Sequence, residues 1–128
     1  MNAMVGDAGN FSQTGTNLNN PGYVQFFKAF TIPRPSDIFV FLDEHPDSID
    51  DGYFLNREVS PASWNDLPAS YHDGAASFSF ADGHSEIKKW RDQKVRGCSS
   101  VPSKLQRDSG ADALRWLQDR STRKLSGQ

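Results

Sequence analysis

The sequence predicts an α+β domain built mainly on an antiparallel β-sheet, and three stretches of the chain carry that prediction. Ile38 to Leu42 is a run of five apolar residues, β-branched and aromatic, which favours a strand. Ala75 to Ala81 and His84 to Trp90 flank the turn dipeptide Asp82-Gly83, which is typical of a hairpin. The Ala, Leu, Gln and Arg content of Ala111 to Arg120 favours a short helix.

The length of 128 residues suits one domain, residues 1–128. Residues 1–22 are rich in Gly, Asn, Thr and Ser, so we expect this part to be loop-rich. Residues 121–128 form a polar terminus that we expect to be disordered. The elements of the sheet and the helix therefore lie between these two ends.

The strand at Ile38 to Leu42 follows Pro33 and Pro35, which exclude a helix or a central strand just before it. Five consecutive apolar residues leave no polar face. We therefore expect this strand to be buried on both faces.

The hairpin pattern also predicts a register. A two-residue loop pairs Ala81 with His84 and, further along, Phe78 with Ile87. The apolar face would then hold Phe78, Phe80 and Ile87, and the polar face would hold Ser77, Ser79, Glu86 and Lys88. A type I′ turn of this kind requires a positive φ at Gly83.

Composition excludes several classes of function. The formal net charge of -2 provides no basic field for nucleic acid or anionic lipid. A single cysteine, Cys98, excludes an intramolecular disulfide and a cysteine-based zinc site, and one nearby arginine is thin support for a reactive thiol. The chain has no Walker loop, no Gly-x-Gly-x-x-Gly and no Gly-x-Ser-x-Gly motif.

Five carboxylates fall within nine positions after the predicted strand. They are Asp43, Glu44, Asp47, Asp50 and Asp51. Several oxygens from one flexible loop are what calcium prefers, so these residues are candidate calcium ligands. The spacing does not match the EF-hand pattern, because Ile49 stands where a ligand is needed. The alternative is a solvated acidic loop whose Asp side chains cap turns.

Histidine and tryptophan residues offer two further alternatives. His45, His72 and His84 could hold a metal or transfer protons, but no helix carries paired histidines, so hydrogen bonding to loop backbone is favoured. Trp64, Trp90 and Trp116 could stack on sugar rings, but core packing is favoured. A metal-dependent hydrolase and a carbohydrate- or ligand-binding module therefore stay open as alternatives.

His72 is followed by nine residues and then by Asp82-Gly83. This spacing resembles the motif of the prepilin-type, "processing-associated H-X9-DG" proteins, which are similar to type IV pilins and type II secretion pseudopilins. The stretch from Ile38 to Phe54, the opening Met1 to Gly6 and the closing Trp116 to Arg120 resemble the same family. The resemblance covers nearly the whole chain.

The resemblance implies a pilin-like globular head that acts as a non-enzymatic assembly subunit. Its partners would be other pilin-like subunits or secretion-apparatus proteins, outside the cytoplasm. Family members begin with a leader and a long apolar helix that anchors them in the inner membrane, and this chain starts at Met1 without them, so we interpret it as the head alone.

The motif itself favours structure over catalysis. A straight strand of ten residues spans about 33 Å. His72 and Asp82 would therefore lie at opposite ends of one strand, too far apart to form a catalytic pair. We expect no catalytic residue in this chain.

Overall fold

The computed structural model describes residues 1–126 apart from 14, 59–63, 92–94 and 96–110. The described elements are, in chain order, η1 (Gly9–Phe11), β1 (Ser12–Gln13), β2 (Thr16–Asn17), η2 (Ala29–Thr31), η3 (Pro35–Asp37), β3 (Phe39–Leu42), β4 (Ala75–Phe80), β5 (Ser85–Lys89) and α2 (Ala111–Ser121). No helix among them is long and apolar enough to cross a membrane. Cys98 lies outside the described residues.

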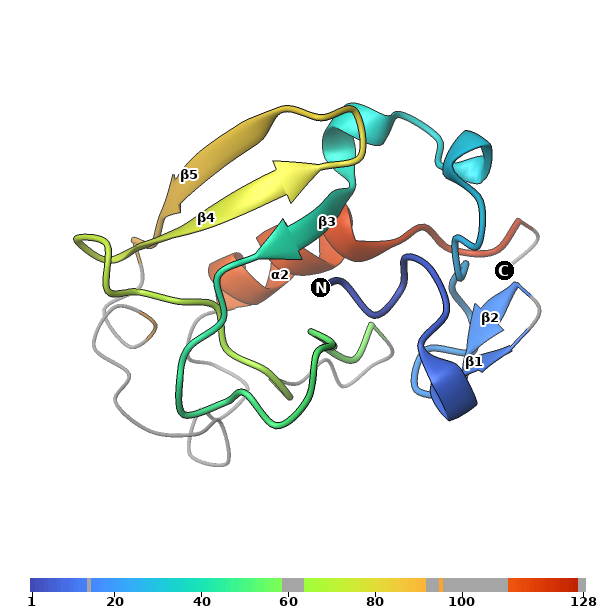
Figure 1. The fold of residues 1–128 in the computed structure, drawn as a ribbon, viewed down its shortest axis with the longest axis horizontal. Coiled ribbons are helices and arrows are strands. Elements are labelled where there is room, and N and C mark those ends of the chain that lie inside the picture. Colours follow the sequence, from blue (N-terminus) through green and yellow to red (C-terminus); the bar gives the residue numbers. More distant parts are fainter. Residues whose placement is uncertain (14, 59–63, 92–94, 96–110, 127–128) are drawn as a thin grey trace.

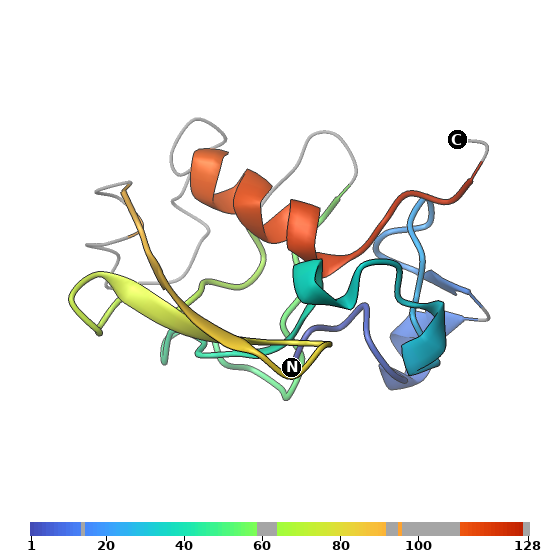
Figure 2. The same ribbon diagram turned by 90° about the horizontal axis from the view of Figure 1, so that it is seen from above.

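Two layers form the main body of the protein. The strands β3, β4 and β5 make an antiparallel sheet in that order, and α2 lies across one face of it, as Figures 1 and 2 show from two directions. The short strands β1 and β2 pair separately near the N-terminus. The predicted α+β class with a mainly antiparallel sheet is confirmed, and the predicted helix is present as α2.

Aromatic side chains join the sheet to the helix. The ring of Phe78 on β4 meets Phe39, Trp90 and Trp116 edge-on, with centroids 5.4, 6.1 and 5.0 Å apart. Leu117 on the same helix is fully buried in this cluster. Edge-to-face rings bury a large area and fix orientation, so this cluster determines how α2 lies on the sheet.

The register predicted for the hairpin is wrong by one residue. Phe78 pairs with Glu86, and Ile87 pairs with Ser77. The loop has three residues, because Phe80 and His84 pair and Gly83 N–H donates to Phe80 O at 2.9 Å. Gly83 has a φ of 95° while Asp82 keeps a negative φ, so the turn is type I followed by a left-handed glycine and not type I′.

The extra loop residue moves Ile87 to the other face. Phe78 and Phe80 are buried as expected, but Ile87 is 76% exposed and lies on the outer face with Ser77. Lys88 turns toward the helix instead, where its Nζ lies 5.1 Å from the centre of the Trp116 ring. A shift of one residue exchanges the faces of a strand, and this is the consequence here.

The strand β3 is buried on one face only, contrary to expectation. The register shifts between Phe39 and Phe41, which pair with Phe80 and Ser79, so Val40 is an extra residue in β3. Residues two apart normally share a face, but the bulge sends Phe39 into the core and leaves Phe41 57% exposed. The outer face of the sheet is uncovered in the described part of the chain, which explains the exposed phenylalanine.

Buried amide side chains hold the loop-rich part together. Asn2 donates to Phe39 O at 2.8 Å and to Ser121 O at 2.9 Å, and its Oδ1 accepts from Met4 N–H. Asn20 and Gln25 bond the backbone of neighbouring loops in the same way. These side chains satisfy backbone groups that regular structure would otherwise pair.

Residues 121–126 are part of the fold, whereas composition predicts disorder there. Thr122 is buried and its hydroxyl donates to Val24 O at 2.6 Å. Leu125 N–H donates to Gly22 O at 3.0 Å. The segment after α2 is held in an extended ladder against the 22–24 segment, and a tertiary pairing of this kind overrides a polar composition.

Candidate functional site

The residues of the H-X9-DG motif lie at the two ends of β4. His72 precedes the strand, and its Nε2 lies 3.4 Å from Asp43 Oδ2, which also accepts from Ser77 N–H at 3.2 Å. Asp82 and Gly83 follow the strand in the hairpin turn. The motif therefore marks both ends of the central strand, and His72 and Asp82 do not form a pair.

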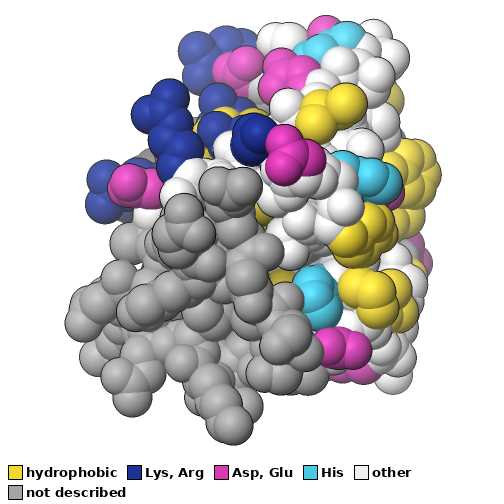
Figure 3. All heavy atoms as spheres, turned by 90° about the vertical axis from the view of Figure 1, so that its left-hand side faces the viewer, with side chains coloured by type: hydrophobic (Ala, Val, Ile, Leu, Met, Phe, Trp, Pro, Cys, Tyr) yellow, Lys and Arg dark blue, Asp and Glu magenta, His cyan; other side chains and the backbone are white. Residues whose placement is uncertain are grey.

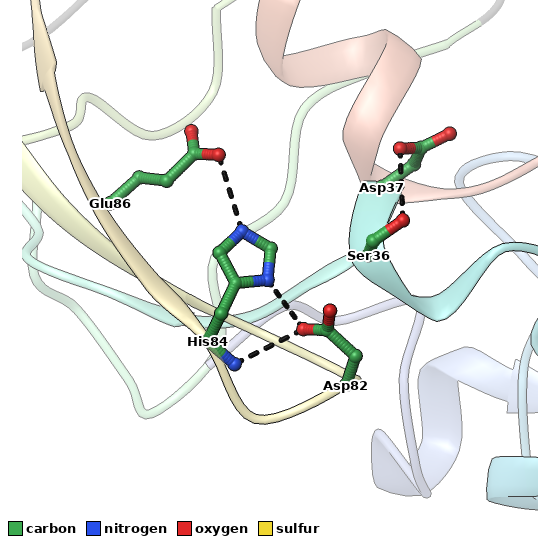
Figure 4. Close-up of polar contacts among 5 residues, drawn as sticks. All are labelled: Ser36, Asp37, Asp82, His84 and Glu86. Atoms are coloured by element: carbon green, nitrogen blue, oxygen red, sulfur yellow. Dashed lines mark hydrogen bonds and ion pairs between the residues drawn. The ribbon is translucent and has the colours of Figure 1, made fainter.

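At the end with Asp82, His84 forms a polar group with Asp82 and Glu86. Figure 4 shows the imidazole of His84 between two carboxylates, with Nδ1 2.5 Å from Asp82 Oδ1 and Nε2 3.2 Å from Glu86 Oε1. Asp82 Oδ1 also accepts from His84 N–H at 3.1 Å. The ring of His84 is stacked on that of Phe80, with centroids 4.4 Å apart.

Electrostatics favour the charged form of this imidazole. The hydrogen bond to Asp82 raises the pKa of His84, and the bond to Glu86 raises it further. The same hydrogen bond lowers the pKa of Asp82, helped by the backbone N–H of His84. Both ring nitrogens face carboxylates, so neither offers a free lone pair to a proton donor or a metal.

A nucleophile is also missing from this group. Ser36 is the nearest hydroxyl drawn in Figure 4, and its Oγ lies 3.4 Å from Asp37 Oδ1. No hydrogen bond joins Ser36 to His84 in that view. A nucleophile and its base must lie within hydrogen-bond reach of each other, and this pair does not meet that requirement.

The predicted acidic loop divides into parts with different partners. Asp43 joins His72 and β4, and Glu44 Oε1 accepts from the Ser48 hydroxyl at 2.7 Å. Asp51 Oδ1 accepts from Tyr53 N–H at 2.6 Å, which is a turn-capping bond. Asp47 lies beside His45, whose Nδ1 accepts from Asp47 N–H. The carboxylates of Asp43, Glu44 and Asp51 therefore each have a different protein partner.

Asp50 and Asp51 line a cavity of about 400 Å³ with a residue that sequence reasoning missed, Asp66. Asp66 is buried, and its Oδ2 accepts from Leu55 N–H at 2.6 Å. Burial raises the pKa of Asp66 to about 7, and the nearby Glu44, Asp50 and Asp51 carboxylates add to that rise. No local pattern marks Asp66, because the loop around it is brought to this cavity by tertiary packing.

Metal and sugar sites find little support in the described residues. In that part of the chain no three His, Cys, Asp or Glu side chains are placed to hold a metal ion. The histidines visible in Figure 3 lie apart from one another. Trp64 and Trp90 belong to the hydrophobic core, so they form no exposed pair on which a sugar could stack.

Comparison of the chain with models of known families, with characterised proteins and with solved structures finds no match.

Proposed function

We propose that this chain is a non-enzymatic assembly module, the globular head of a pseudopilin or minor pilin. The observation that carries the proposal is the use of the H-X9-DG motif: its residues secure the two ends of β4 and do not meet in a site. At the first end His72 Nε2 lies 3.4 Å from Asp43 Oδ2, and at the other end Gly83 forms the turn. This placement supports a structural role of the motif over a catalytic one.

The outer face of the sheet supports a role in assembly. Phe41 and Ile87 are large apolar side chains on that face, and both are exposed. Contacts between subunits commonly cover such side chains. Under this proposal the partners are other pilin-like subunits or proteins of a secretion apparatus, and the head works outside the cytoplasm.

The test follows the natural gene product in its own cells. An antibody raised against this domain locates the protein in membrane, sheared-filament and soluble fractions, and mass spectrometry reads its mature N-terminus. We expect a membrane or filament protein whose apolar N-terminal helix begins at a prepilin-type cleavage site. A product found only in the cytosol, with no such helix, contradicts the proposal.

A second arm tests the absence of catalysis. The purified domain is assayed on generic ester, phosphate and glycoside substrates beside a His72→Ala variant. We expect no turnover above the buffer rate for either protein. Turnover that His72→Ala abolishes would show an active site at the motif and would replace the assembly role with an enzymatic one.

A further inference from the structure

A cavity of about 680 Å³ is lined by residues from α2, from η3 and from the segment after α2. Figures 1 and 2 show that the chain leaves α2 beside η3. It is separate from the His84 group. Its described lining gathers five of the 14 Lys and Arg residues of a chain with a net charge of -2. These residues are Arg34, Arg115, Arg120, Arg123 and Lys124. Positive charge concentrated in a hollow attracts anions.

Two of these guanidinium groups are held in place by the helix end. Arg120 Nη1 donates to Trp116 O at 3.3 Å, and Arg123 Nη1 donates to Asp119 O at 2.5 Å. Cations at a helix C-terminus also balance its dipole. These bonds place two guanidinium groups on the wall of the cavity.

The cations that line the cavity differ in how many carboxylates lie close to them. Asp37 Oδ2 lies 3.0 Å from Arg34 Nε and 3.7 Å from Arg123 Nη2, so one carboxylate is shared by two guanidinium groups. Arg115 and Lys124 have no ion pair within the described parts of the chain. Arg120 also has no carboxylate partner among the described residues, but its guanidinium bonds Trp116 O and lies over the Trp116 ring. Arg115 and Lys124 are therefore the lining cations that the described residues leave most open to a ligand.

Glu58 gives the cavity an unusual carboxyl group. Its Oε1 is buried and has no hydrogen-bond partner within the described residues. Burial raises the pKa of Glu58 to about 8, the nearby Asp119 raises it further, and a hydrogen bond to Ser121 opposes the rise. Tyr23, on the facing segment, donates to the backbone oxygen of Glu58 at 3.0 Å. At neutral pH Glu58 is mostly protonated and adds little negative charge.

We propose that this cavity binds an oxyanion, the phosphate or carboxylate group of a small ligand. In the described lining, five cations face three carboxyl groups, those of Asp37, Glu58 and Asp119. A guanidinium group can donate two parallel hydrogen bonds to the oxygens of one phosphate or carboxylate group. The volume of about 680 Å³ is in the range of small-molecule sites. The proposal does not depend on the assembly role, because the hairpin motif contributes no residue to the lining.

The experiment titrates inorganic phosphate, and separately malonate, into the labelled domain at constant ionic strength while backbone amide NMR shifts are recorded. We expect saturable shifts at Arg115, Gln118 and Lys124. Arg115→Gln and Lys124→Gln should each weaken binding by about three- to tenfold, the effect of losing one charge near a surface-bound anion. Lys28→Gln removes the same charge outside the cavity and should leave binding unchanged.

The phosphate titration, the malonate titration and their pH dependence together test the proposed anion site. Saturation by phosphate alone or by malonate alone supports the site and identifies the group it prefers. Binding should weaken as pH rises through about 8, because ionised Glu58 repels the anion, and Glu58→Gln should remove that dependence. No saturable shift with either anion, or an equal loss in Lys28→Gln, overturns the proposal.

Discussion

The imidazole of His84 and the phenyl ring of Phe80 lie stacked at a centroid distance of 4.4 Å and an interplanar angle of 7°. The contact crosses the hairpin turn and keeps the His84 ring between its two carboxylates. A short loop and one aromatic neighbour thus fix the position of a charged group that is partly open to solvent.

Removing the Asp82 charge should lower the pKa of His84. The bond to Asp82 is the largest cause of the raised pKa and the bond to Glu86 is the second, so Asp82→Asn should lower it more than Glu86→Gln. Asparagine keeps an oxygen for the His84 N–H, so the turn should persist. An NMR titration of the imidazole resonances measures both variants. Equal shifts would show that Asp82 is not the dominant partner.

Replacing Gly83 with valine should destabilise the domain by about 1–2 kcal/mol or more, since a β-branched residue resists the left-handed backbone. Gly83 has a φ of 95°, and a Cβ there would meet no atom within 4 Å. The loss of stability would therefore come from backbone strain and not from a steric clash. Gly52→Val is the matched control, because Gly52 also has open space but no positive φ. Equal melting temperatures for the two variants would contradict the turn described.

The same glycine shows why the sequence located the hairpin but misplaced its register. Asp82-Gly83 predicts a turn whose glycine has a positive φ, and that is what the structure has. A positive φ is needed both in a two-residue type I′ loop and at the end of a three-residue loop. The dipeptide does not distinguish them, and the difference of one residue decides that Ile87 faces solvent.

The sequence did not predict which polar side chains are buried, and the reason is different. Glu58 and Asp66 have ordinary local sequences, and their raised pKa values come from segments that pack over them. The buried amide of Asn2 bonds Ser121, 119 positions away. Such pairings depend on the tertiary structure, whereas β3, β4, β5 and α2 follow from local composition and were predictable.

Asn2→Ala should cost about 3 kcal/mol of stability. The substitution leaves the buried oxygens of Phe39 and Ser121 without their donor, and each unpaired buried group costs about 1–3 kcal/mol. Asn10→Ala is the control, because Asn10 is exposed. Denaturant unfolding measures both. A loss no larger for Asn2→Ala than for Asn10→Ala would mean that the amide bonds contribute little.

Calcium, rather than a transition metal, should stabilise the acidic loop if any cation does, because its ligands are hard oxygens. The described residues hold no ready-made cluster of three ligands, so the loop would have to rearrange around an ion. Binding would then raise the melting temperature by a few degrees with millimolar calcium relative to chelator, and not with zinc. Asp51→Ala should remove the rise, because Asp51 shares a cavity with Asp50 and Asp66, and Asp47→Ala tests the exposed part of the loop. No calcium-dependent change would indicate a solvated loop.

Asp66 should make the domain less stable as pH rises. Its folded pKa of about 7 lies above the ordinary value of 3.8, so the folded state holds the proton more tightly than the unfolded state. The stability that Asp66 contributes is therefore fully present below about pH 4 and is lost as pH rises toward 7. Asp66→Asn keeps an acceptor for Leu55 N–H and removes the titration.

The variant should therefore match the wild type near pH 4 and exceed it in stability near pH 8. Glu58→Gln is the comparison, because Glu58 titrates at about 8 and its effect extends to higher pH. Urea unfolding in chelator across this range separates the two groups, since the Asp66 contribution is complete before that of Glu58. An Asp66→Asn curve that keeps the wild-type slope between pH 4 and 7 would show that the Asp66 carboxylate is ionised in the folded protein.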